Sequence, residues 1–231
     1  MKKVILACMS LAIATSAFGS LSKDEVKRLE ESAAIVRELR TAPDKAIPEQ
    51  LWDKAECVLV IPSIKKAAFI VGGEYGSGVM SCRTGADWSA PVFMQLAKGS
   101  WGLQIGAEQI DLVLLVMNKG GVDKLLKDKV SLGGDASVAA GPIGRSAQAA
   151  TDAQLSAEML SYSRSQGVFA GIDISGGMLS PDKNALERAY GQHVTAQGVI
   201  TGASRVTSPA EAKVFLQELR LGTSRQAASH R

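Results

Sequence analysis

The sequence predicts an α+β fold in which a curved antiparallel sheet, or a barrel-like core, is flanked by helices at both ends of the chain. Helical patterns occur before residue 57 and after residue 180, strand patterns fill the middle, and the connections between strands are short. No linker rich in Pro, Gly or Ser divides the chain. We therefore expect a helical segment over 20–56 and one core over 57–222.

The first 19 residues have the layout of a secretory signal peptide. Lys2 and Lys3 precede an apolar run over 4–14, and small residues lead to a cleavage site after Gly19. The run is too short to be an ordinary membrane span. We expect a protein that is exported to the periplasm or secreted, and that can associate with a membrane. A lipoprotein attached through Cys8 is the minor alternative.

The charge of the remaining chain argues against nucleic acid as a partner. The sequence has 26 basic and 23 acidic residues, and removal of Lys2 and Lys3 leaves 24 and 23. Nucleic-acid binding depends on many cations that neutralise phosphates, so a nearly neutral protein is not expected to do it. An anionic partner has to be bound by a local patch.

A helix is predicted to begin at Ser22 and to run to about Arg40. Ser22 and Glu25 have the spacing of a capping box. Apolar residues then recur at steps of 3, 4 and 3 from Val26 to Val36, which places them on one face. Because the polar face carries both signs of charge, this stripe can pack on the sheet or lie in a lipid interface. A second, short helix should begin at Pro48.

The middle of the chain indicates strands. The run CVLVIPSI starts a buried strand at Cys57 that we expect Pro62 to close. Three strands should follow, with a tight turn at Lys98-Gly99 between the first two: 92–97, 100–107 and 110–117. Next come a turn with two helical turns over 118–129, an extended segment over 130–144, and a hairpin that turns near Gln166-Gly167.

Two helices are predicted near the end of the chain. Ser180-Pro181 should start one that Gly191 stops, and Ser208-Pro209 should start another that Gly222 stops. We expect residues 223–231 to form a flexible tail.

Four glycines in GGEYGSG, residues 72–78, raise the question of a nucleotide site. A phosphate-binding loop needs a Lys after its last glycine and a helix beyond it, and here Val79 follows within a strand pattern. The spacing of a dinucleotide fingerprint is also missing. The glycines are better explained by a bent strand that another backbone approaches closely.

Catalytic and metal-binding patterns are weak. The folded region has one histidine, His193, and no G-x-S-x-G motif, so we do not expect nucleophilic hydrolysis. Cys57 and Cys82 with His193 and His230 lack the paired spacing of metal ligands. In an oxidising compartment the two cysteines can form a disulfide, or they can be two small buried residues; both remain open.

Several blocks, in this order, resemble the SYLF domain family: VLVIPSIKKAAFIVGGEYGSGVM, WSAPVFMQLAKGSWGLQIGAEQIDLVLLVM, VSLGGDASVAAGPIGR, YSRSQGVFAGIDISGGMLSPD and AYG. The resemblance runs from about Ala34 to Gly191. It implies a domain that binds membrane phospholipids, phosphoinositides in eukaryotic members, with the help of an N-terminal amphipathic helix. It implies no reaction and no cofactor.

The resemblance supplies candidate lipid-binding residues. The amphipathic segment corresponds to Val26, Lys27, Arg28, Leu29, Val36 and Leu39. Charge or aromatic character at predicted strand ends or loops adds Lys65, Lys66, Trp101 and Arg145. Eukaryotic members are associated with actin, but an exported chain is not expected to meet it.

The sequence thus predicts a non-enzymatic protein of the bacterial envelope that binds anionic phospholipid headgroups through local cations and an amphipathic helix. The alternative is an envelope structural or interaction protein that binds another protein and no lipid.

Overall fold

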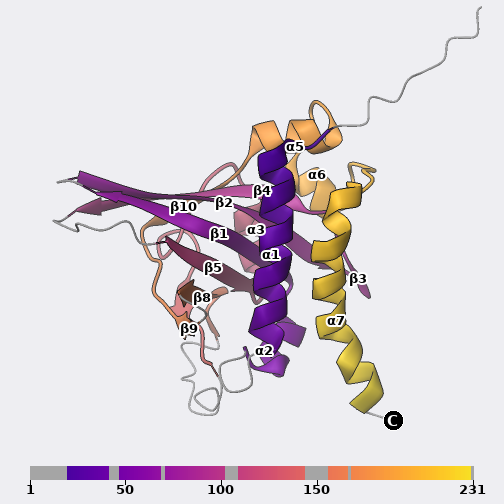
Figure 1. Cartoon of the computed structure of the whole chain (residues 1–231), viewed down its shortest axis with the longest axis horizontal. Coiled ribbons are helices and arrows are strands. Elements are labelled where there is room, and N and C mark those ends of the chain that lie inside the picture. The colour runs from indigo at the N-terminus through magenta and orange to yellow at the C-terminus, as the bar shows by residue number, and fades with distance from the viewer. Residues whose placement is uncertain are drawn as a thin grey trace, which may run out of the picture.

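The computed structural model describes residues 20–41, 47–68, 71–101, 109–143, 156–165 and 168–229. In these residues ten strands join one sheet (Figure 1): β1 (Cys57–Ala68), β2 (Val71–Thr84), β3 (Asp87–Trp88), β4 (Val92–Trp101), β5 (Gln109–Val116), β6 (Val130–Ser131), β7 (Val138–Ala140), β8 (Met159–Ser165), β9 (Val168–Gly171) and β10 (Gly177–Pro181). The helices are α1 (Lys23–Thr41), α2 (Glu49–Lys54), α3 (Lys119–Leu125), α5 (Lys183–Tyr190), α6 (Ala196–Ile200), the 3-10 turn η2 (Ala210–Ala212) and α7 (Lys213–Ser229). The predicted signal peptide, residues 1–19, lies outside the described residues.

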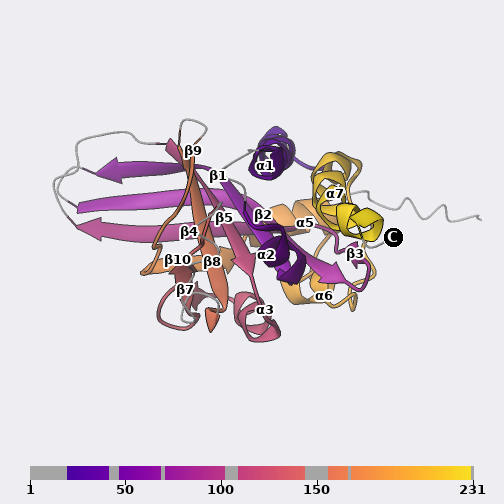
Figure 2. The same ribbon diagram turned by 90° about the horizontal axis from the view of Figure 1, so that it is seen from below.

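The sheet has the order β6-β10-β4-β2-β1-β5-β8-β7, with β3 beside β2 and β9 beside β8. The paired strands are antiparallel except β7 and β8, which are parallel. The sheet curls into a half-barrel, as Figure 2 shows from below. The predicted α+β class with a curved sheet and flanking helices is confirmed.

The centre of the sheet explains the uninterrupted apolar run of β1. Residues 57–61 are fully buried, because α1 packs on one face of β1 and the curl of the sheet encloses the other. A strand that is covered on both faces needs apolar residues at consecutive positions rather than at alternate ones.

The glycine-rich stretch is a strand, β2, and two of its glycines, Gly76 and Gly78, lie against an irregular part of β1. The register between β1 and β2 shifts between Val60 and Lys65, and Ser63 there has a φ of 56°. A Cβ on Gly78 would lie 2.2 Å from the carbonyl oxygen of Val60, and one on Gly76 would lie 2.5 Å from Ile61. The predicted close approach of two backbones is therefore present.

The same irregularity corrects one prediction. Pro62 does not close the strand, since β1 continues to Ala68. Pro62 lies where the pairing of β1 with both neighbours shifts, so its missing N–H breaks no regular ladder. The backbone N–H of Ser63 donates instead to the carboxylate of Asp111 on β5, at 2.9 Å.

Other predicted boundaries also need correction. Lys98 and Gly99 form no turn, because they pair with Glu74 and Gly73 of β2 and β4 runs through them. Of the predicted strand 100–107, the first two residues belong to β4, and 102–107 lie outside the described residues. The hairpin of β8 and β9 is confirmed, while its turn at 166–167 is also outside them.

The two predicted C-terminal helices exist with shifted ends. Pro181 ends β10, and α5 begins at Lys183 with Asp182 as its cap. Gly191 ends α5 with a φ of 93°, as predicted. Gly222 does not stop α7, which continues to Ser229. A single glycine costs a helix only about 1 kcal/mol, so it does not have to end one.

Among the described residues, three strands extend beyond the rest of the sheet. We call this extension the arm; it consists of residues 65–68 of β1, 71–75 of β2 and 97–101 of β4. The pairing of β5 with β1 ends at Lys65, and the pairing of β10 with β4 ends at Lys98. Figures 1 and 2 show the arm on the side of the molecule away from α7.

Candidate functional site

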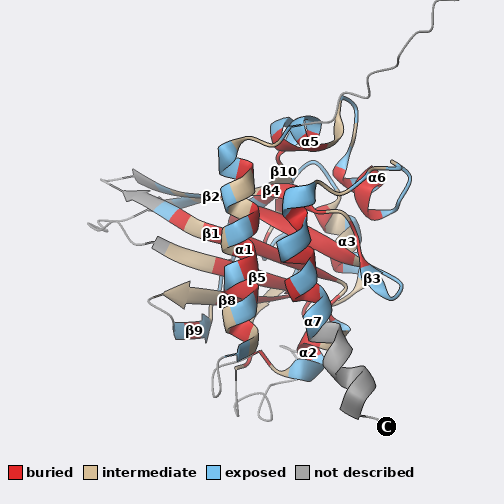
Figure 3. Ribbon diagram, turned by 45° about the vertical axis from the view of Figure 1, so that its right-hand side comes forward, coloured by how far each residue is buried: buried red, intermediate tan, exposed pale blue. Residues whose placement is uncertain are grey.

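Helix α1 packs its apolar stripe on the protein. Leu29, Val36 and Leu39 are buried, and Val26 is half-buried. Figure 3 shows the exposed residues of α1 on its outer side. The capping box is present, since the N–H of Glu25 donates to Ser22 Oγ and the N–H of Ser22 donates to the Glu25 carboxylate. In this position the three buried side chains cannot contact lipid, so their predicted role would require α1 to leave the sheet.

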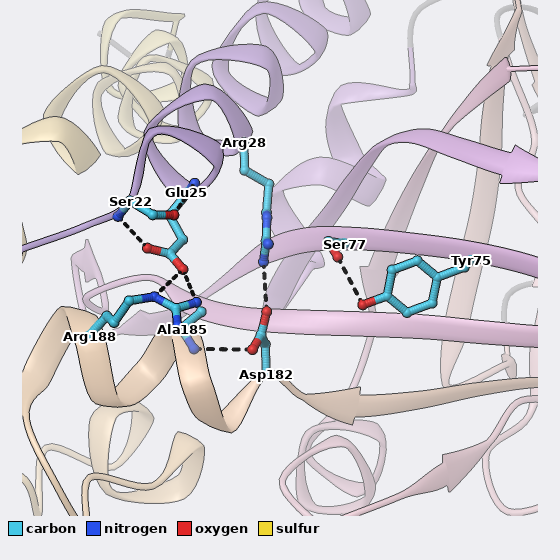
Figure 4. A network of polar contacts seen from close by, with 8 residues as sticks. All are labelled: Ser22, Glu25, Arg28, Tyr75, Ser77, Asp182, Ala185 and Arg188. Carbon is cyan, nitrogen blue, oxygen red and sulfur yellow. Dashed lines mark hydrogen bonds and ion pairs between the residues drawn. The ribbon is translucent and has the colours of Figure 1, made fainter.

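Ion pairs hold the first half of α1 against α5 (Figure 4). The carboxylate of Glu25 is 1% exposed and is bound by the guanidinium of Arg188. Arg28 donates to Asp182 at 3.1 Å, and its guanidinium lies 5.8 Å from the centre of the Phe93 ring. Arg28 is therefore committed to the interior of the protein, and this predicted headgroup ligand already has an anionic partner.

Both acids of this network have lowered pKa values. Burial raises the pKa of Glu25, but hydrogen bonds from Arg188 and Ser22 outweigh it and leave the pKa below its usual range. Burial likewise raises the pKa of Asp182. Hydrogen bonds from the N–H of Ala185 and from Arg28 and Gln95 outweigh this effect, so the pKa of Asp182 is also below its usual range.

The second half of α1 is held in the same way. Arg37 donates to Glu218 of α7 at 2.8 Å, and Arg40 donates to the carbonyl oxygen of Glu218. Glu38 pairs with Arg164 of β8, which also binds Asp111. Charged contacts thus fix α1 along its length to α5, α7 and the sheet.

Acid should weaken this attachment. A carboxyl with a lowered folded-state pKa stabilises the protein above its unfolded-state pKa, about 4, and loses that contribution as the pH falls through its folded-state pKa. We expect the free energy of unfolding to fall below about pH 4. At neutral pH, Glu25→Gln should cost about 1–2 kcal/mol, because the buried amide pairs poorly with Arg188.

Urea unfolding at pH 7 and pH 3 measures both effects. Glu25→Gln should reduce the loss of stability between the two pH values, and the remaining loss comes from other acids with lowered pKa values, such as Asp87 and Glu158. An unchanged pH dependence in the variant would contradict the role of Glu25.

A groove of about 280 Å³ lies between α1 and the β1–β2 hairpin. It is lined by Asp24, Lys27, Arg28, Glu31, Pro62, Ser63, Lys65, Tyr75, Gly76 and Ser77. The fold thus brings together three of the predicted cations. Lys27 is 70% exposed and is 3.7 Å from Glu31, a surface pair of little energetic value. Lys65 is exposed and makes no ion pair with the part of the chain that is described.

Tyr75 was not predicted as a site residue, yet it forms one wall of the groove. Its hydroxyl accepts a hydrogen bond from Ser77 at 3.3 Å (Figure 4), and half of its surface is exposed. The signal that could have found it is the alternation along β2, in which Tyr75 and Ser77 share one face.

Three further predicted ligands have side chains that the structure does not describe. Lys66 and Trp101 belong to the arm by backbone position. Arg145 also lies outside the described residues.

Cys57 and Cys82 form a disulfide between β1 and β2. They are directly paired in the ladder, and both are buried. Of the two alternatives that the sequence left open, the structure contains the bridge.

A second groove, of about 870 Å³, lies where α3, α5 and α6 meet. His193 lines it with a φ of 65°, beside Asp128, Glu187 and Thr195. The described lining has carboxylates but no serine, and none of the described residues forms a hydrogen bond with the His193 ring that would activate a nucleophile.

Within the described residues, no helix is long and apolar enough to cross a membrane.

Comparison with known proteins identifies the family. A sequence profile named Ysc84 and described as "Las17-binding protein actin regulator" matches residues 97–221, more than half of the chain. The protein belongs to the Ysc84 family. This is the SYLF domain family, so the resemblance drawn from the sequence blocks is confirmed.

Relatives of this Ysc84-family chain are known from animals and yeast. It is 33% identical over 204 residues to the SH3 domain-containing YSC84-like protein 1 of Bos taurus, and this alignment covers 85% of this chain and 58% of the bovine protein. It is 34% identical over 166 residues to LAS seventeen-binding protein 3 of Saccharomyces cerevisiae, and this alignment covers 70% of this chain and 36% of the yeast protein. The chain therefore spans only part of each relative. The name of the yeast relative is that of a binding protein.

Proposed function

We propose that this Ysc84-family chain binds anionic phospholipid headgroups at the groove between α1 and the β1–β2 hairpin. The observation that carries the proposal is the meeting of Lys27 and Lys65, two exposed cations from separate elements, in one groove. A cation near an anionic membrane surface contributes about 1 kcal/mol. Asp24 and Glu31 in the same groove offset part of this attraction, so the binding is modest and depends on salt.

The headgroup binds to the folded protein as it stands. Since Leu29, Val36 and Leu39 are buried and α1 is fixed by ion pairs, the helix supplies its polar face, Lys27 above all, rather than its apolar stripe. No bond is made or broken, and the protein acts as a binding module.

We place this activity at a bacterial envelope membrane. The support is the signal-peptide pattern of residues 1–19, and the lipids available there include anionic phospholipids. Actin is a cytosolic protein, so we do not assign the actin connection in the family's description to an exported chain.

Charge reversal at the groove tests the proposal. Lys27→Glu combined with Lys65→Glu should weaken co-sedimentation with anionic vesicles about tenfold or more at low salt, because two attractions become repulsions. The difference should shrink in about 1 M NaCl, where charges are screened within roughly 3 Å. Lys119→Glu combined with Lys213→Glu, at exposed positions of α3 and α7, changes the net charge by the same amount. This double variant is the matched control and should bind nearly as the wild type does.

Two results would overturn the proposal. One is equal, negligible recovery of the wild type on anionic and zwitterionic vesicles. The other is equal weakening by the groove variant and by Lys119→Glu with Lys213→Glu, which would show that net charge rather than the groove determines binding.

The second candidate is an interaction protein that binds a protein and no lipid. The words "Las17-binding" in the family description favour it. It predicts that a specific partner co-purifies from the native host while vesicle binding is absent.

A further inference from the structure

Four exposed residues form a row across four strands, and the first two of them also line the groove. Lys65 of β1 pairs with Tyr75 of β2, Tyr75 pairs with Ala97 of β4, and Ala97 pairs with Met178 of β10. Directly paired residues in antiparallel strands point to the same face of a sheet. The four side chains, which we call the exposed row, therefore lie together on the face that α1 also contacts.

The described part of the chain leaves the exposed row open to solvent. Tyr75 is 50% exposed and Met178 is 39% exposed, and both are among the few large apolar residues that the described surface presents. Two positions further out on the same face lie Gly73 and Gly99, which pair with each other and are exposed. A Cβ added to Gly99 would meet no atom within 4 Å. At these two positions the backbone itself is open to a second surface.

The composition of the row fits one kind of partner. Tyrosine is favoured at membrane interfaces because its ring is apolar and its hydroxyl is polar, and here the hydroxyl is bound to Ser77 while the ring stays exposed. Lysine can extend its ammonium group to phosphates while its stem lies on apolar surface. Lys65 stands at one end of the row and Lys27 in the adjoining groove, so cations border an apolar strip on one side.

We infer that the exposed row is the membrane-docking face of the protein. Tyr75 and Met178 enter the interfacial region of the bilayer, and Lys65 and Lys27 bind phosphates beside them. This inference rests on the proposed function and adds to it an apolar contact with the lipid surface. It also sets an orientation, in which the outer part of the sheet, not the stripe of α1, lies on the membrane.

A fluorescent label tests the contact directly. Met178→Cys in a Cys8→Ser background is labelled with an environment-sensitive dye; Cys57 and Cys82 do not react because they are bridged and buried. Anionic vesicles should shift the emission of this label to the blue. Val214→Cys on α7, 47% exposed in the wild type, is the matched control and should show no shift.

Removal of the apolar groups tests the energetics. Tyr75→Ser with Met178→Ser should weaken vesicle binding roughly five- to tenfold, because less apolar surface leaves water. Its salt dependence should remain that of the wild type, whereas Lys27→Glu with Lys65→Glu should reduce the salt dependence. Both substitutions are at exposed positions, and circular dichroism checks that the variant is folded.

The outcomes separate the two proposals. Vesicle binding that depends on Lys27 and Lys65, with no shift at position 178 and no effect of the Ser substitutions, would overturn the docking face and leave the headgroup groove. Absence of wild-type binding to any vesicle would overturn both. Loss of a co-purifying protein in the Ser variant, without any vesicle-induced shift at position 178, would overturn the lipid contact and assign the row to a protein partner.

Discussion

Replacement of Gly78 by alanine is expected to lower the free energy of unfolding by about 3 kcal/mol. The new Cβ would lie 2.2 Å from the carbonyl oxygen of Val60 and 2.9 Å from the Cα of Ile61. These are backbone atoms of the central strand, which is buried on both faces, so no side chain can rotate away to make room. Urea unfolding of the variant and the wild type measures the difference.

Gly99→Ala is the matched control for this prediction. Gly99 also lies in a strand, but its added Cβ would meet nothing within 4 Å. Its effect should be close to zero, or a gain of up to about 1 kcal/mol from the lower entropy of the unfolded chain. Equal unfolding midpoints for Gly78→Ala and the wild type would show that the backbone of β1 does not approach Gly78 of β2 as closely as described.

Removal of the disulfide should have an effect of similar size. Cys57 and Cys82 are 25 residues apart, and a cross-link that closes a loop of this length restricts the unfolded chain by about 3 kcal/mol in the chain-entropy description. The double variant Cys57→Ala, Cys82→Ala should therefore unfold at a lower guanidinium concentration, with little change in the native fold.

Thiol titration supplies the control for the disulfide. Because both sulfurs are buried, mild reductant should leave the bridge intact in the native protein and should open it once denaturant is added. Free Cys57 and Cys82 thiols in the unfolded, unreduced protein would contradict the bridge.

The sequence predicted the elements whose signal is local. The capping box at Ser22 and Glu25 marks the start of α1, and the uninterrupted apolar run marks β1. The predictions that were wrong concern strand ends and turns, which depend on how neighbouring strands pair. Pro62 ends a strand in isolation but is accommodated where the pairing shifts above the β2 glycines. A Lys-Gly pair favours a turn unless a partner strand continues beside it, as β2 does beside β4.

The candidate site was predictable only in part. Lys27 and Lys65 were selected for their charge, and the fold brings them into one groove. Tyr75 and Met178 were missed because their proximity depends on a register that joins residues about a hundred positions apart. From the sequence, the apolar stripe of α1 could either pack on the sheet or lie in a lipid interface. The structure shows it packed on the protein.

The order of the strands limits how this family can be divided into fragments. The family match begins at residue 97, inside β4, whereas β1 and β2 precede it in the chain and separate β4 from β5 in the sheet. A polypeptide limited to residues 97–221 would lack those two strands and would leave two open edges, each able to pair with other chains and aggregate. A fragment made for experiments should therefore begin no later than α1. The smallest part of the chain that folds on its own is longer than the segment that matches the family.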